Sequence, residues 1–132
     1  MPVTDPIADM LIRIKNAARV RRDQVDMPAG KFKLELAKVL KAEGFIKNYK
    51  LIQAEKKDQL RIFLKYDSKK RSAILGLERV SKSGRRVYVG AGEIPEVRGG
   101  LGVMVLSTNQ GLFTDQQAKK MNLGGELICK VW

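Results

Sequence analysis

The 132-residue sequence contains no histidine and a single cysteine, Cys129. Without histidine it lacks both the commonest general base and the commonest metal ligand. One cysteine cannot form an internal disulfide, and it cannot build a zinc site. These absences exclude classical catalytic triads and zinc-dependent hydrolysis, and they predict a protein of the reducing cytoplasm.

Several other features are scarce. Aromatic residues make up 6% of the chain, too few for a stacking channel along single-stranded nucleic acid. No apolar run approaches the roughly 20 residues of a membrane helix, and residues 1–7 do not resemble an export signal. Gly90 and Gly92 lack the spacing of a nucleotide-binding loop, and the scattered carboxylates, Asp115 included, form no paired acid-base arrangement. We therefore expect no cofactor, no metal and no enzymatic activity.

Positive charge, by contrast, is abundant. Lysine and arginine number 26 against 14 acidic residues, which gives a net charge of +12 and a pI near 10.0. Both halves of the chain carry the excess, so the charge belongs to folded surface and not to a tail. Hydrophobic residues reach 44%, enough for a core. A protein of this composition usually binds a polyanion.

The first half predicts a small α/β unit. A helix opens at Asp5-Pro6, with Ile7, Leu11, Ile14 and Ala18 at inward-facing spacing. A second helix covers 31–43 and ends at Gly44. Strands are expected at 25–27, 46–54 and 60–66, with a turn at 56–58. Two helices would then cover one face of a three-stranded sheet.

The second half predicts mostly β-structure. Residues 67–72 form the expected linker, followed by strands at 74–80, 86–89, 103–107 and 126–132. Residues 90–102 are expected to form a loop or a short helical turn. A short helix over 114–122 carries a capping box of Thr114 and Gln117. The predicted fold is α+β with two small domains, an α/β domain over 1–66 and a mostly β domain with one short helix over 67–132.

Two polar loops near the C-terminus are the main binding candidates. Residues 107–111, Ser-Thr-Asn-Gln-Gly, follow an apolar strand, and Gly124-Gly125-Glu126 precede the last strand. Such residues offer hydrogen-bonding groups at close range to a sugar-phosphate backbone or a base edge. The ordinary alternatives are a strand-to-helix loop that bonds to its own backbone and a turn that needs positive φ. Since phosphate would repel Glu126, we expect it to fix Ser107 or Thr108, or to accept from a base amino group.

Basic residues supply further candidates. Arg86 and Tyr88 alternate along one strand, so they share a face that offers charge and a stacking surface. The alternative is a solvated arginine beside a half-buried core tyrosine. Lys15, Arg19 and Arg22 form one cluster and Lys56-Lys57 another. Charged faces are usually only solvated, but in so basic a protein some are expected to meet the polyanion.

A family resemblance extends over essentially the whole chain. It lies in Asp5–Leu11, Arg13-Ile14, Asn16, Gly44–Ile46, Arg79–Ser81, Arg86–Tyr88, Gly100–Gly102, Ser107-Thr108, Gly111, Thr114-Asp115, Ala118 and Gly124–Glu126. These residues resemble bacterial ribosomal protein number eight of the small (30S) subunit. The sequence departs from that family at Asn109, where serine is common, at Lys130, where tyrosine is usual, and at Ser83 and Arg85, where proline and leucine are more usual.

The resemblance implies a two-domain α+β protein that binds the central domain of 16S ribosomal RNA early in subunit assembly. The RNA site is an irregular stem with an internal loop, and the Ser-Thr and Gly-Gly-Glu loops of the C-terminal domain are the main protein surface. In some bacteria the family also represses its own operon by binding an mRNA mimic of that site. Carried onto this chain, the surface comprises Ser107, Thr108, Gly111, Gly124, Gly125 and Glu126, with Arg86 and Tyr88 beside them.

We therefore predict a structural, RNA-binding protein of the small ribosomal subunit. The expected partners are 16S ribosomal RNA, neighbouring small-subunit proteins and the protein's own operon mRNA. The candidate RNA-binding residues are Ser107, Thr108, Asn109, Gly111, Gly124, Gly125, Glu126, Tyr88, Arg86 and Lys56. Two alternatives are a small RNA-processing enzyme, which the missing histidine opposes, and a non-specific packaging protein, which would bind any duplex equally.

Overall fold

A computed structural model describes residues 5–132, and it divides them into two compact units. The N-terminal unit comprises residues 7–75. The C-terminal unit comprises residues 76–132 together with Asp5 and Pro6. The fold class is α+β as predicted: the first unit is a sheet with two helices, and the second is mostly β.

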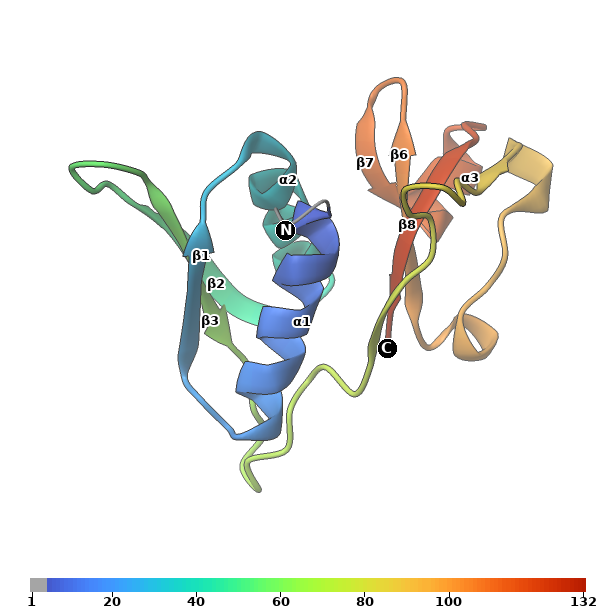
Figure 1. Ribbon diagram of the computed structural model, residues 1–132. Helices are drawn as coiled ribbons and strands as arrows, with labels where there is room; N and C mark the ends of the chain where they lie inside the picture. The colour runs from blue at the N-terminus through green and yellow to red at the C-terminus, as the bar shows by residue number, and fades with distance from the viewer. Residues whose placement is uncertain (1–4) are drawn as a thin grey trace. The chain divides into compact units, whose positions relative to one another are not determined.

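In the N-terminal unit, helices α1 (Pro6–Arg19) and α2 (Lys31–Ala42) lie on the same side of a three-stranded antiparallel sheet (Figure 1). Its strands β1 (Gln24–Pro28), β2 (Ile46–Ile52) and β3 (Gln59–Leu64) follow the order β1-β3-β2. Alternate residues of β3 are buried, as the period-two pattern predicted. The core takes its largest buried side chains from every element: Met10, Ile14, Met27, Leu36, Leu40, Ile46, Leu60 and Ile62.

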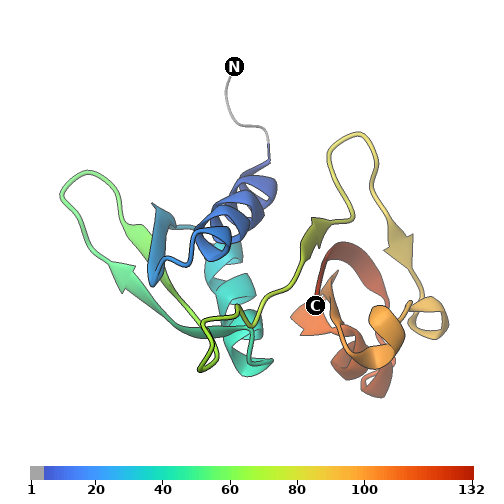
Figure 2. The ribbon, with the colours of Figure 1, turned by 90° about the horizontal axis from the view of Figure 1, so that it is seen from below.

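The C-terminal unit is a five-stranded sheet with short helical segments. Strands β4 (Leu77–Arg79), β8 (Gly125–Val131), β6 (Val103–Thr108) and β7 (Gly111–Thr114) follow in that order, and β5 (Tyr88–Val89) also pairs with β8. Residues 91–93 and 98–100 form 3₁₀ turns, in the region expected to be a loop or helical turn. The loop that joins β4 to β5 projects beyond the sheet (Figure 2).

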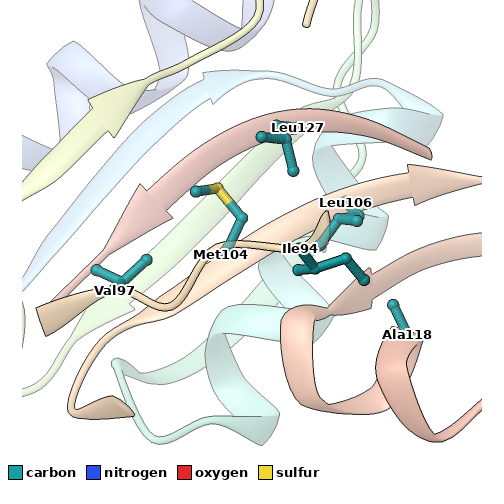
Figure 3. Close-up of a cluster of buried hydrophobic side chains, with 6 residues drawn as sticks. All are labelled: Ile94, Val97, Met104, Leu106, Ala118 and Leu127. Carbon is teal, nitrogen blue, oxygen red and sulfur yellow. The ribbon is translucent and has the colours of Figure 1, made fainter. Parts of the chain in front are cut away.

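One face of this sheet packs against α3 (Asp115–Lys120). Figure 3 shows the cluster of buried hydrophobic side chains on this face. Met104, Leu106 and Leu127 of the sheet pack there with Ala118 of α3 and with Ile94 and Val97, which come from the segment between β5 and β6. The predicted capping box begins α3: Thr114 Oγ1 accepts from the Gln117 N–H at 3.2 Å, and the Gln117 side chain accepts from the Thr114 N–H at 3.0 Å. The cluster and cap together fix the end of the β6–β7 hairpin.

Three local predictions are wrong. The strand expected at 74–80 is limited to β4, because residues 74–75 do not pair, and the strand expected at 86–89 is limited to β5. Strand β7 was not predicted, since four residues next to a helix cap show little alternation. It turns the expected strand-to-helix loop at 107–111 into a hairpin turn.

The segment 67–72, expected as a linker, is an ordered turn. The Asp67 carboxylate accepts from the N–H groups of Lys69 and Arg71, both at 2.8 Å, and pairs with Arg71 Nε at 2.7 Å. These bonds hold the pKa of Asp67 below its usual value, through the Arg71 N–H above all. The turn belongs to the compact N-terminal unit. That residues 67–132 form a separate domain stays a prediction.

Candidate nucleic-acid interface

Nine of the ten predicted binding residues lie at one end of the C-terminal sheet. In the strand register Tyr88 of β5 lies opposite Glu126 of β8, which lies opposite Ser107 of β6. Directly opposed residues share a face, so these three side chains form one row across three strands. The sheet-end surface, as we call it, comprises Arg86, Tyr88, Ser107, Thr108, Asn109, Gly111, Gly124, Gly125 and Glu126. Lys56 is not among them; it lies exposed in the β2–β3 loop of the other unit.

Tyr88 projects from this surface into solvent. Its side chain is 68% exposed, while its neighbours Val87 and Val89 pack against the buried cluster on the opposite face. Alternation along the strand explains the difference. The half-buried core tyrosine considered as an alternative is therefore wrong. An exposed aromatic ring on a rigid strand is suited to stacking on an unpaired base.

Glu126 is held by the β4–β5 loop. Its carboxylate accepts a hydrogen bond from the hydroxyl of Ser81, which is fully buried, and one from Arg86 Nη1 at 3.0 Å. Ser81 Oγ in turn accepts from the Val87 N–H at 3.1 Å. The expectation that Glu126 fixes Ser107 or Thr108 is wrong, because the hydrogen-bond partners of its carboxylate, Ser81 and Arg86, lie in the β4–β5 loop. The arrangement neutralises the carboxylate and fixes the direction of Arg86.

Arg86 stays available despite this pairing. Its side chain is 50% exposed, against 17% for Glu126. A pair this open contributes about 0.2–1 kcal/mol to stability. Its larger effect is to limit the rotamers of Arg86, so that the charge is held two residues before the ring of Tyr88 on β5.

The two hydroxyls of the β6–β7 hairpin differ. Thr108 Oγ1 donates to the Gly111 carbonyl at 2.9 Å and accepts from the Gln110 N–H at 3.1 Å, so it closes the turn, as the ordinary alternative proposed. Ser107 Oγ makes no hydrogen bond to any of residues 5–132. Asn109 and Gln110 are exposed at the tip, and Gly111 has a φ of 122°. Ser107 is therefore the free hydroxyl on this hairpin.

Gly124 and Gly125 serve strand packing. Neither has a positive φ, so the turn considered as an alternative does not form. A Cβ on Gly124 would collide with the Val89 carbonyl, and a Cβ on Gly125 with the Ser107 carbonyl. The space freed by the missing side chains is thus filled by β5 and β6 of the same unit. The glycines bring Tyr88 and Ser107 close to Glu126.

Metal-binding clusters, Asp115 and Cys129 bear on the alternative of an RNA-processing enzyme. Residues 5–132 hold no group of three or more acidic or cysteine side chains placed to bind a metal. Asp115 is buried in the first turn of α3, where it accepts from the Met104 N–H at 3.4 Å. Burial raises the pKa of Cys129 to about 12, so the thiol stays protonated at neutral pH. No helix within 5–132 is long and apolar enough to cross a membrane.

Sequence reasoning missed Ser81 as a site residue. Its role depends on a hydroxyl buried between β4, β8 and the loop, which no local pattern reveals. A turn follows Ser81, in which Lys82 and Arg85 exchange backbone hydrogen bonds at 3.2 and 2.8 Å. A buried serine that bridges a carboxylate and a backbone N–H is found only from coordinates.

These features define a class: a basic α+β protein that presents aromatic, hydroxyl and guanidinium groups on a sheet end. Comparison with known proteins identifies the family. Residues 5–132 match the family model described as ribosomal protein S8, and the chain belongs to that family. Its relatives named small ribosomal subunit protein uS8 include those of Thermodesulfovibrio yellowstonii (54% identical, over 98% of this chain and 99% of the relative), Geobacter sulfurreducens (53%, over the full length of both) and Thermus thermophilus (50%, over 98% and 99%).

Family membership makes the chain a structural protein of the small ribosomal subunit and not an enzyme. Its partners are accordingly ribosomal RNA and other ribosomal proteins. The prediction made from the N-terminal and C-terminal motifs is confirmed at this level.

Proposed function

We propose that this protein binds 16S ribosomal RNA directly, at a stem in the central domain, and helps to assemble the platform of the small subunit. The sheet-end surface is the primary contact in this proposal. The observation that carries it is the row Tyr88–Glu126–Ser107, in which an exposed ring, an oriented arginine and a free hydroxyl converge. An irregular RNA stem offers a partner for each of these groups: an unpaired base for the ring, a base edge or 2′-OH for the hydroxyl, and a phosphate for the arginine.

The roles within this surface differ. Tyr88 stacks on an unpaired base, Arg86 binds phosphate, and Ser107 bonds to a base edge or a 2′-OH. Thr108, Asn109 and Gly111 shape the hairpin tip, while Gly124, Gly125 and Glu126 hold the strands and the arginine in place. Lys56 adds a phosphate contact from the N-terminal unit. The C-terminal part, residues 67–132, is the main RNA-binding module.

The same surface would serve a second target. The family resemblance supports repression of the protein's own operon through an mRNA segment shaped like the ribosomal site. Such a mimic must present the same unpaired base and 2′-OH groups, so both RNAs would compete for Tyr88 and Ser107.

Footprinting on 16S RNA with the full-length chain tests the proposal. We expect one compact protected stem in the central domain. Tyr88→Ala should weaken binding by about 1–3 kcal/mol, the range for base–aromatic stacking, while Tyr88→Phe should stay near wild type. Protection spread along every duplex would instead support the non-specific packaging alternative.

A further inference from the structure

The last residue of α1 and the loop that follows it carry three arginines whose side chains have no partner among residues 5–132. Arg19, Arg21 and Arg22 are all exposed, and none of their guanidinium groups forms an ion pair or hydrogen bond with residues 5–132. The other arginines of the N-terminal unit each hold a carboxylate: Arg13 with Asp9, Arg61 with Asp26 and Arg71 with Asp67. Unpaired arginine is thus concentrated in residues 19–22, the last residue of α1 and the loop after it, which we call the arginine loop.

The backbone of this loop adopts, at Arg21, a left-handed conformation that favours glycine. Helix α1 ends with Arg22 N–H bonded to the Ala17 carbonyl (2.9 Å) and with Arg21 in the left-handed region, at φ 59°. Helix α2 ends in the same way, but the left-handed position there is Gly44, at φ 82°. An L-residue is less stable than glycine in this conformation. Stability therefore does not explain an arginine at position 21.

The loop is also held in place. The Tyr66 hydroxyl donates to the Arg22 carbonyl at 2.6 Å, and the Leu64 N–H donates to the Asp23 carbonyl at 2.9 Å. Burial raises the pKa of Tyr66, so its hydroxyl stays a donor. Two successive carbonyls are thereby tied to the end of β3 and the residues after it. The side chains of Arg21 and Arg22 start from a fixed backbone, which lowers the entropy lost on binding.

A groove of about 610 Å³ opens beside the loop. Its lining includes Arg19 and Arg22, together with Arg13, Gln24 and Asp26. Asp26, the acid in this lining, already accepts hydrogen bonds from Arg61 at 2.8 and 3.1 Å. Because Asp26 is paired while Arg19 and Arg22 are not, the groove favours an anion.

We propose that the arginine loop is a second RNA contact, which binds backbone phosphates through Arg19, Arg21 and Arg22 without reading bases. Guanidinium groups match phosphate oxygens bidentately, and three of them on one pre-organised loop can follow successive phosphates. The contact belongs to the N-terminal unit and is additional to the sheet-end surface.

Arg21→Gly in the full-length chain gives the sharpest test. Glycine relieves the strain, so the melting temperature should stay the same or rise. Affinity for a small-subunit ribosomal RNA transcript should fall about 3–10-fold, and the slope of log affinity against log salt should decrease by about 1. Lys38→Gln, which removes an exposed charge from α2 of the same unit, is the matched control and should cost less than about twofold. Equal losses for the two variants, or no loss for Arg21→Gly, would overturn the proposal.

A second variant separates position from charge. Tyr66→Phe keeps every charge but frees the Arg22 carbonyl, so affinity should fall about 2–3-fold with an unchanged salt slope. Unchanged affinity would overturn the role given to the fixed backbone.

An unrelated RNA duplex distinguishes this proposal from the one above. Variants of the arginine loop should lower the affinity for the ribosomal transcript and for the duplex by the same factor. Tyr88→Ala and Ser107→Ala should lower the affinity for the transcript alone. Loss of site preference in Arg21→Gly would overturn phosphate-only binding. If Tyr88→Ala leaves the affinity for both RNAs unchanged, the role assigned to the sheet-end surface is wrong. The proposal for the arginine loop is then decided by the Arg21→Gly result alone.

Discussion

The Glu126 carboxylate accepts a hydrogen bond from the buried hydroxyl of Ser81. This contact joins the last strand to the loop between β4 and β5, and the same carboxylate orients Arg86. Ser81→Ala would leave the Val87 N–H without its side-chain acceptor and would remove one of the hydrogen bonds that Glu126 accepts. We expect the free energy of unfolding to fall by about 1–3 kcal/mol in urea titrations, the cost of an unmet buried hydrogen bond. Ser83→Ala, in the exposed turn beyond, should be nearly neutral, and equal effects of the two changes would contradict this role.

The two hairpin hydroxyls should separate binding from stability. Ser107→Ala removes a group that has no partner among residues 5–132, so stability should hold while cognate RNA affinity falls by about 1–3 kcal/mol. Thr108→Ala breaks two hydrogen bonds of the turn and should lower stability by about 0.5–1.5 kcal/mol. Filter binding and thermal unfolding on both variants measure the two effects. A stability loss for Ser107→Ala would show that its hydroxyl is part of the fold.

Gly125→Ala should act through the fold and not through RNA. The new methyl group would meet the Ser107 carbonyl, so β6 and β8 must move apart and their ladder weakens. We expect destabilisation of about 1–3 kcal/mol, typical of overpacking. Gly92→Ala is the matched control, because its Cβ would meet nothing within 4 Å. A stable Gly125→Ala protein that fails to bind RNA would reassign this glycine to the RNA contact.

Acid should weaken the N-terminal unit through Asp26. Its hydrogen bond from the Arg61 side chain lowers the pKa of Asp26 in the folded state. The ionised carboxylate therefore stabilises the fold above the ordinary aspartate pKa, and that contribution is lost as pH falls through the lowered value. Asp26→Asn should remove about 0.2–1 kcal/mol at neutral pH, a small effect because the pair is partly exposed.

The unfolding free energy measured against pH tests this expectation. The difference between wild type and Asp26→Asn should shrink towards zero as the solution becomes acidic. Asp58→Asn, at an exposed aspartate that forms no ion pair within residues 5–132, should parallel the wild type at every pH. A wild-type minus Asp26→Asn difference that is constant with pH would rule out the ion pair as its cause.

Cys129 should report unfolding. The thiol is fully buried and its pKa is raised to about 12, so an aromatic disulfide reagent should not modify the native protein at neutral pH. Modification should appear in urea together with the loss of circular dichroism. A cysteine placed in the exposed turn by S83C should react at once. Rapid labelling of Cys129 in the native protein would show that the C-terminal sheet opens locally.

The sequence alone determined much of this protein. Periodic apolar residues predicted α1, α2 and the three-stranded sheet, because each of these elements buries one face and repeats its pattern over several turns or residues. The capping box located α3 since its chemistry is local. The absence of histidine and the basic composition excluded most enzyme classes, and the ordered set of motifs identified the family before any coordinates.

Tertiary structure decided which groups of the candidate site are free. Ser107 and Thr108 are adjacent in sequence and both carry a hydroxyl group. The Thr108 hydroxyl is bonded to the Gly111 carbonyl of β7, a strand that was not predicted, whereas the Ser107 hydroxyl is left free within residues 5–132. The Glu126 carboxylate bonds to Ser81 and Arg86, and not to the β6–β7 hairpin, because β5 and the β4–β5 loop lie beside β8. Positions 124 and 125 require glycine because the backbones of β5 and β6, which are distant in sequence, approach them too closely for a Cβ atom. Such relations depend on long-range register, which the local pattern of residues does not encode.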